Sequence, residues 1–182
     1  MKLTTKKIVV AAVLAAISIL LGVTRLGYIP VPNVAGNATI MGVPVYIGAV
    51  LEGWPVGVIL GFIFGLSSFL GATVPMFKDP LVSILPRLLI GITPYLAYIA
   101  VRKKNEIMAY GLAGLVGSLS NTVFVVGAII LRGYYTFHQM LTVIPQAIAE
   151  AILSVILTVA VCAAWNRVQL GSGKSKISSV SD

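Results

Sequence analysis

The chain has 182 residues, of which 58% are hydrophobic and 10% are charged, and its net charge is +8. An ordinary soluble domain carries about 25% charged residues, so this composition excludes a soluble globular enzyme, a disordered chain and a disulfide scaffold, and it indicates an integral membrane protein. One cysteine and one histidine lead us to expect no metal site and no cofactor in this chain. The positive charge is attributed to basic loops at a membrane surface and not to nucleic-acid binding.

Six apolar segments are candidate membrane spans, because a helix of about 20 apolar residues crosses a bilayer core of about 30 Å. In chain order they are Ile8–Val23, Ala38–Leu51, Gly53–Val74, Leu81–Val101, Ile107–Leu131 and Leu141–Trp165. The second segment is short enough to be re-entrant, so the placement of Lys and Arg has to decide its course.

The positive-inside rule favours six spans with both termini in the cytoplasm. On that path nine loop cations lie inside and three outside, whereas five spans would put five inside and seven outside. The inside cations are Lys2, Lys6, Lys7, Arg102, Lys103, Lys104, Arg167, Lys174 and Lys176, and the outside cations are Arg25, Lys78 and Arg132.

These patterns predict an all-α integral membrane protein, a bundle of six transmembrane helices over residues 1–168. The Ser-, Gly- and Lys-rich tail over residues 169–182 is expected to be disordered in the cytoplasm. The sequence Gly173–Ser175 imitates the end of a phosphate-binding loop, but Val168 stands where that motif needs glycine. We therefore expect no nucleotide site in this chain.

Two outer loops, residues 24–37 and 73–80, are rich in proline, which fixes φ and removes a backbone donor. Loops on one face of a rigid scaffold often cover a binding site, although these two could be plain connectors. The candidate gating residues are Tyr28, Pro30, Pro32 and Phe77, and the candidate ligand contacts in the first loop are Asn33 and Asn37.

Four residues with charged or amide side chains fall within the apolar segments, where polar side chains are costly and rarely face lipid. Arg87 lies about 9 Å, and Glu150 about 13 Å, from the outer end of its segment at 1.5 Å per residue. Gln146 precedes Glu150 by about one turn, and Asn121 falls in the outer half of the fifth segment. Their convergence on one level predicts a site for a small polar solute that binds from outside.

Two interpretations of Arg87 remain open, because a permanent guanidinium cation needs an anion or a wet cavity. The anion is either Glu150, at a similar depth, or a carboxylate or phosphate of the solute, which a guanidinium can hold by two hydrogen bonds. A network that contains both is a third arrangement. Glu150 and Gln146 could also serve as hydrogen-bonding glue between helices.

Two segments carry small residues at helical spacing, which permits close approach of another helix. In the first segment these are Ala11, Ala12, Ala15 and Ala16, and in the third they are Gly57, Gly61 and Gly65. Internal packing is favoured for the glycines. The alanines are a candidate surface for a partner helix.

The chain resembles the substrate-binding S component of an energy-coupling factor (ECF) vitamin transporter, and most of all the pantothenate-type branch. The resemblance rests on the basic N-terminus, the alanine pairs, the six spans and three stretches, Ile29–Gly53, Gly57–Leu70 and Phe77–Gly91. It extends over nearly all of residues 1–168. It implies high-affinity capture of a vitamin, with pantothenate favoured, at the outer face of a bacterial cell membrane.

The resemblance further implies partners that this chain lacks: a transmembrane coupling subunit, which would bind Ala12 and Ala16 or the frame Ala11 and Ala15, and two ATPase subunits. Toppling of the S component would carry the vitamin inward, with the two outer loops as gates. The alternatives are an S component for another vitamin or precursor, such as cobalamin, riboflavin, folate or a queuosine precursor, and a small membrane assembly protein. An intramembrane enzyme is disfavoured, because the sequence does not supply the nucleophile or metal ligands that such an enzyme would need.

Overall fold

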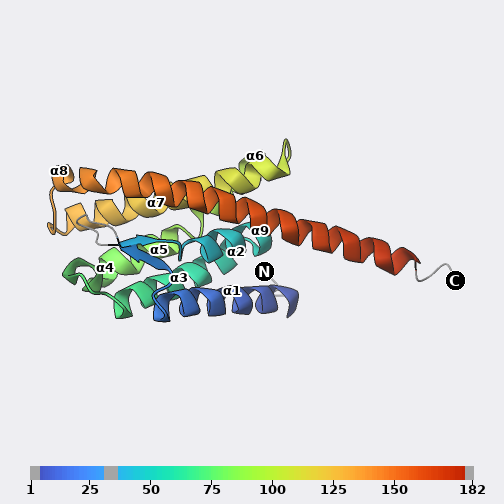
Figure 1. The fold of residues 1–182 in the computed structure, drawn as a ribbon, viewed down its shortest axis with the longest axis horizontal. Coiled ribbons are helices and arrows are strands. Elements are labelled where there is room, and N and C mark those ends of the chain that lie inside the picture. Colours follow the sequence, from blue (N-terminus) through green and yellow to red (C-terminus); the bar gives the residue numbers. More distant parts are fainter. Residues whose placement is uncertain (1–4, 31–36, 179–182) are drawn as a thin grey trace.

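The computed structural model describes residues 5–30 and 37–178, and helices account for most of them (Figure 1). The helices are α1 (Thr5–Val23), α2 (Val43–Glu52), α3 (Trp54–Leu70), α4 (Pro80–Ser83), α5 (Leu85–Leu89), α6 (Thr93–Val101), α7 (Glu106–Leu131), α8 (Phe137–Met140) and α9 (Ile144–Ser178). Two 3-10 turns, η1 (Pro75–Lys78) and η2 (Leu141–Val143), precede α4 and α9. The strands β1 (Tyr28–Pro30) and β2 (Asn37–Thr39) pair antiparallel, with Ile29 opposite Ala38.

The prediction of a membrane protein agrees with the helices. Over the described residues, three helical stretches are long and apolar enough to cross a bilayer: Pro80–Val101, Glu106–Leu131 and Phe137–Gln169. Shorter apolar helices occupy Lys7–Val23, Val43–Glu52 and Trp54–Leu70. Large apolar side chains such as Leu20, Val123 and Ile152 are more than half exposed. Exposed apolar surface on this scale is suited to contact with lipid.

The all-α prediction is wrong in the first outer loop, where β1 and β2 form a short hairpin. The second segment was expected to be helical from Ala38, but Ala38 and Thr39 belong to β2, and α2 begins only at Val43. Ala38 and Thr39 lie in a strand because this segment pairs with β1, and because Thr39 N donates a hydrogen bond to the Glu150 side chain of α9. A proline in the first turn of α2, Pro44, suits the helix start, where its missing N–H has no helical partner.

The fourth segment is not one continuous helix but is divided into α4, α5 and α6. Pro80, Pro86 and Pro94 stand at the starts of these three helices, and each removes a donor that a continuous helix would need. The third segment ends as a helix at Leu70, before the predicted Val74. The last helix continues to Ser178, where an irregular tail was expected from residue 169, and disorder of that tail in solution stays a prediction.

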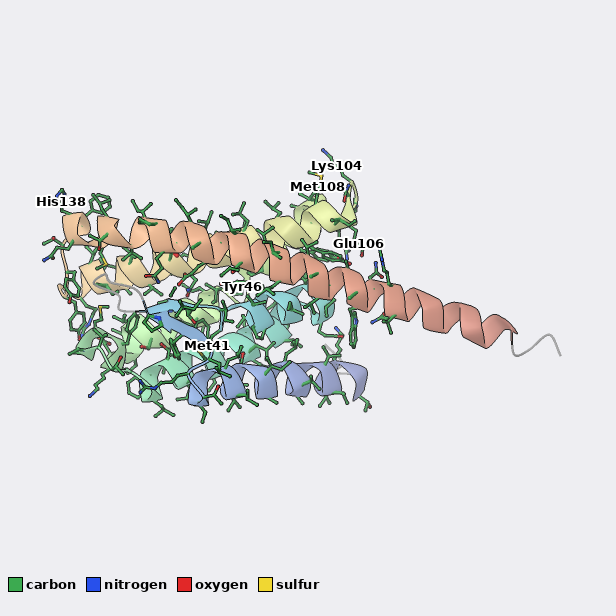
Figure 2. The ribbon with its side chains drawn as sticks, viewed as in Figure 1. Met41, Tyr46, Lys104, Glu106, Met108 and His138 are labelled. Carbon is green, nitrogen blue, oxygen red and sulfur yellow. The ribbon has the colours of Figure 1, made fainter. Side chains whose placement is uncertain are left out.

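The hairpin and the short helices α4 and α8 lie at one end of the bundle, and the start of α1 and the α6–α7 connection lie at the other (Figure 1). Figure 2 shows His138 at the first end and Lys104 and Glu106 at the opposite end. Met41 and Tyr46 lie between these ends and are buried in the main hydrophobic core. At the end with Lys104, Glu106 joins two helices by accepting from Tyr110 of α7 at 2.8 Å and from the Asn166 amide of α9 at 2.9 Å. We call the end with β1, β2, α4 and α8 the hairpin end, and the end with the α6–α7 connection the basic end.

Candidate substrate-binding site

The position of Arg87 follows from the proline beside it. Pro86 has no N–H, so the carbonyl of Val82 receives no helical hydrogen bond from the residue four positions on. The guanidinium of Arg87 takes that place, with Nη1 donating to Val82 O at 2.6 Å. The break between α4 and α5 therefore fixes the Arg87 side chain against its own backbone.

Helix α3 holds this segment from the other side through its glycines. A Cβ on Gly61 would overlap the carbonyl of Arg87, and a Cβ on Gly57 would overlap the backbone of Gly91. A Cβ on Gly65 would come within 3.0 Å of Ser83 O. The internal packing predicted for this glycine face is confirmed, and the face sets how deeply Arg87 lies.

Arg87 is 4% exposed and sits between two aromatic rings. Its Cζ lies 5.3 Å from the centroid of Phe64 and 5.5 Å from that of Phe77, distances at which a cation is attracted to a ring face. Its Nε is buried without a hydrogen-bond partner. The guanidinium therefore keeps hydrogen-bonding capacity that the described residues do not use.

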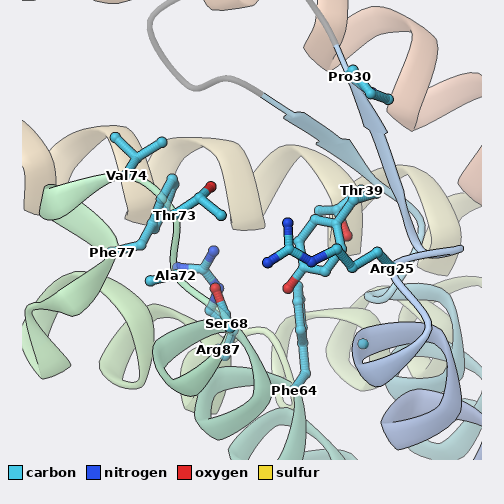
Figure 3. Close-up of a pocket in the computed structure, with 13 residues that line it drawn as sticks. Arg25, Pro30, Thr39, Phe64, Ser68, Ala72, Thr73, Val74, Phe77 and Arg87 are labelled. Atoms are coloured by element: carbon cyan, nitrogen blue, oxygen red, sulfur yellow. The ribbon is translucent and has the colours of Figure 1, made fainter.

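Two cavities meet at Arg87. The larger has a volume of about 280 Å³ and is lined by residues of the first outer loop, α3, the second outer loop and α5 (Figure 3). The smaller, of about 60 Å³, reaches toward α7 and α9. Thr39, Phe77 and Arg87 line both cavities.

The four predicted intramembrane residues come together in the smaller cavity. Arg87, Asn121, Gln146 and Glu150 all line it, from α5, α7 and α9. Glu150 Oε1 accepts from Thr39 N at 2.7 Å and from Gln146 Nε2 at 2.8 Å. Asn121 is 7% exposed, and its Oδ1 has no hydrogen-bond partner among the described residues.

The proposed ion pair between Arg87 and Glu150 does not form in this structure. Among the described residues, the salt bridge is Arg132 Nε–Asp79 Oδ2 at 2.6 Å, on the rim of the hairpin end. Glu150 is instead held by Thr39 and Gln146. The direct pairing of Arg87 with Glu150 is therefore not observed, and contact of Arg87 with a solute anion, alone or in a network with Glu150, stays a prediction.

The rim residue Asp79 caps α4 and ties it to the end of α7. Its Oδ1 accepts from Leu81 N at 2.9 Å, and the Tyr134 hydroxyl lies 3.4 Å from its Oδ2. The hydrogen bond from Arg132 is the largest effect that holds the pKa of the Asp79 carboxyl below its usual value, and the Leu81 N–H acts in the same direction. Asp79 is thus an anchor of the second outer loop.

The predicted gating residues lie where the loops meet the larger cavity. Tyr28, Pro30 and Phe77 line it, and burial raises the pKa of the Tyr28 hydroxyl, while Arg87 acts in the opposite direction. Pro32 and Asn33 lie outside the described residues, and of Asn37 only the backbone, in β2, is described.

The sequence patterns did not assign to the site several residues that line the cavities, among them Arg25, Thr39, Phe64 and Ser68. Arg25 could have been found as the cation of the first outer loop. Thr39 contributes a backbone N–H, for which no sequence signal exists, and Phe64 looks like any core residue.

The two alanine frames of α1 differ in burial. Ala11 and Ala15 pack against the main hydrophobic core, whereas Ala12 and Ala16 are exposed. The second frame is therefore the one open to a partner helix.

The fold is a bundle of apolar helices, and charged and amide side chains reach its cavities at the hairpin end, an arrangement suited to a membrane protein that binds a small solute. The chain matches the family model described as "ECF transporter, substrate-specific component" over residues 6–162, and it belongs to that family. It is therefore an S component, a substrate-specific subunit of a membrane transporter.

Individual relatives agree with this assignment. The chain is 31% identical, over 160 residues that cover 74% of it and 80% of the relative, to the pantothenic acid transporter PanT of Lactococcus lactis subsp. cremoris (strain MG1363). Its fold is similar to a solved structure described as the S component of a bacterial ECF transporter, with a TM-score of 0.65 and 17% identity, over 90% of this chain and 97% of the other.

Proposed function

We propose that this chain is the high-affinity pantothenate-binding S component of an ATP-driven ECF transporter in a bacterial plasma membrane. The observation that carries the proposal is the buried Arg87 guanidinium, which faces two cavities and has no carboxylate partner among the described residues. Pantothenate is a small anion with amide and hydroxyl groups. The relative named as a pantothenic acid transporter supports the same vitamin.

In this proposal, different site residues bind different parts of the vitamin. Arg87 binds the carboxylate by charge-assisted hydrogen bonds, for which the planar guanidinium is well shaped. Asn121, Gln146 and Glu150 recognise the polar groups of the vitamin, and Tyr28, Pro30 and Phe77 cover it. Pro32, Asn33 and Asn37 belong to the same outer loop and are proposed to act with them.

The cavity volume favours a small ligand over a large one. Ligand pockets commonly measure about 300–1,000 Å³, and the larger cavity, at about 280 Å³, lies just below that range. A vitamin with a flat ring is the second candidate, because the rings of Tyr28 and Phe77 line the cavity and could stack on it. Cobalamin is disfavoured by its size.

Coupling to ATP hydrolysis requires partners. The exposed Ala12 and Ala16 face of α1 is proposed to dock on a transmembrane coupling subunit, which carries two ATPase subunits. Toppling of the S component would then deliver the vitamin to the cytoplasm. In this proposal six segments cross the membrane, both termini are cytoplasmic, and the hairpin end faces outward.

The experiment that tests the function is calorimetric titration of the purified, solute-free chain with pantothenate. We expect a Kd well below micromolar. A charge-assisted hydrogen bond contributes about 1.5–3 kcal/mol, so loss of a bidentate contact in Arg87→Ala should weaken binding about a hundredfold or more. Arg87→Lys should restore only part of the affinity, because an ammonium cannot reproduce the planar fork.

Pantothenyl alcohol, which lacks the carboxylate, provides the matched ligand. It should bind the wild type much more weakly than pantothenate, and it should bind Arg87→Ala about as well as pantothenate does. Equal binding of acid and alcohol by the wild type would remove Arg87 from the ligand. Failure of the wild type to bind either compound would show that the vitamin is a different one.

A further inference from the structure

The two cavities that meet at Arg87 differ in charge. Of the residues that the structure describes, the larger is lined by two with guanidinium groups, Arg25 and Arg87, and by none with a carboxylate. The smaller is lined by Glu150 and by the amides of Asn121 and Gln146, with Arg87 at the junction. An elongated ligand that fills both cavities therefore meets cations at one end and a carboxylate at the other.

Arg25 and Arg87 enter the larger cavity from different parts of the chain. Arg25 extends from the loop after α1 toward the middle of the cavity, and Arg87 reaches it from α5 (Figure 3). Neither has an ion-pair partner among the described residues. Two cations that share a small cavity repel each other, and an anion between them converts that repulsion into attraction.

The backbone at Arg25 is fixed in an unusual conformation. Its φ is 59°, in the left-handed region that L-residues with a side chain rarely adopt. Hydrogen bonds on both sides hold it there: Gly27 N donates to Leu21 O at 3.0 Å, and Tyr28 N donates to Arg25 O at 3.0 Å. A strained residue held by its neighbours is often found at a ligand site.

We propose that Arg25 and Arg87 together hold the anionic end of the ligand in the larger cavity, while its hydroxyl-bearing end lies in the smaller cavity against Asn121 and Glu150. This inference rests on the proposed function and deepens it, because it orients the vitamin. The ligand class is an elongated molecule with a carboxylate at one end and hydroxyl donors at the other. Glu150 Oε1 is a hydrogen-bond acceptor in this structure, so the smaller cavity suits a hydroxyl donor better than a second carboxylate.

The orientation can be tested by crossing two variants with three ligands in calorimetric titrations of the purified chain. The ligands are pantothenate, pantothenyl alcohol, which lacks the carboxylate, and N-pivaloyl-β-alanine, which keeps the carboxylate but lacks the hydroxyls. Arg25→Ala should weaken pantothenate about tenfold and the alcohol less than twofold. Asn121→Ala should weaken pantothenate and the alcohol alike, and should affect the pivaloyl compound less than twofold.

Lys78→Ala is the matched control, since Lys78 is an exposed cation of the other outer loop and does not line either cavity. It should change the affinity for none of the three ligands. An equal loss of acid and alcohol in Arg25→Ala would assign Arg25 a merely structural role and overturn the inference. An Arg25 effect that persists with the alcohol but vanishes with the pivaloyl compound would reverse the orientation.

Different experimental results would contradict the inference and the proposed function. If the wild type binds no member of this ligand set, the proposed vitamin is wrong, and inorganic phosphate then serves as the probe of the arginine pair. Phosphate should raise the unfolding temperature of the wild type and of Lys78→Ala more than that of Arg25→Ala. Equal shifts in all three proteins would overturn the arginine pair as an anion site.

Discussion

At the residue scale, the site depends on a proline that removes a hydrogen bond and an arginine that replaces it. Pro86 leaves the Val82 carbonyl without a helical donor, and Arg87 Nη1 supplies one. A side chain fixed in this way is preorganised, so less conformational entropy is lost when an anion binds. The sequence shows both residues, but only the folded chain shows that they act on the same carbonyl.

The Asp79–Arg132 pair gives the hairpin end a dependence on pH. Because Arg132 holds the pKa of the Asp79 carboxyl below its usual value of 3.8, the carboxylate stabilises the folded state above that pH. This stabilisation is lost as the pH falls through the lowered pKa of the folded protein. Asp79→Asn should therefore unfold at a lower temperature than the wild type at pH 6, and the difference should shrink below about pH 4.

Thermal unfolding in detergent between pH 3 and pH 6 measures this effect. Asparagine can still cap α4, since its side-chain oxygen can accept from Leu81 N, so the variant isolates the charge. Lys78→Gln is a suitable control, because Lys78 is exposed and forms no salt bridge with a described residue. A difference between wild type and Asp79→Asn that stays constant over this range would contradict the assignment.

At the element scale, the glycine face of α3 determines where α5 can lie. Gly61 contacts the Arg87 carbonyl so closely that an added Cβ would overlap it. The backbone cannot rotate away as a flexible side chain could, so Gly61→Ala should displace the segment that carries Arg87. Overpacking of this kind costs about 1–3 kcal/mol.

We expect Gly61→Ala to lower the unfolding temperature and to weaken pantothenate binding at least tenfold. Gly127→Ala is the matched control, because a Cβ at Gly127 of α7 would meet nothing within 4 Å. That variant should be neutral or more stable by up to about 1 kcal/mol, since alanine favours a helix over glycine. Wild-type binding by Gly61→Ala would show that α5 does not depend on this contact.

The two alanine frames of α1 lie on different faces of one helix and should respond differently to bulky residues. Ala12→Leu combined with Ala16→Leu should abolish vitamin uptake by cells and leave binding to the purified chain unchanged, because both side chains are exposed. Ala11→Leu combined with Ala15→Leu should lower the unfolding temperature, because both pack against the core. Loss of binding in the first pair would indicate internal packing instead of a partner surface.

At the scale of the whole molecule, composition and periodicity were sufficient to predict a helical membrane bundle and the residues that meet in its smaller cavity. Arg87, Asn121, Gln146 and Glu150 were found because polar side chains are rare in apolar segments. The hairpin and the contact between Thr39 N and Glu150 could not be predicted, since backbone pairing between distant segments leaves no local pattern. Pro86 and Pro94 indicate the breaks that divide the fourth segment into separate helices. The breaks were not predicted, because the high hydropathy of the segment suggested one continuous span.

The orientation of the molecule in the membrane can be tested with two matched lysine-to-cysteine variants. Lys78 ends η1, directly before α4, which lies at the hairpin end (Figure 1), and Lys104 lies at the basic end (Figure 2); both are exposed. The native Cys162 is completely buried and should not react with a membrane-impermeant maleimide. Because nine of the twelve loop cations fall on one side in the six-span arrangement, the positive-inside rule places the basic end in the cytoplasm. In intact cells Lys78→Cys should therefore be labelled, whereas Lys104→Cys should be labelled only after lysis. Labelling of Lys104→Cys alone would show that the molecule has the opposite orientation in the membrane. The cavities would then lie on the cytoplasmic side, where they could not capture a vitamin from outside.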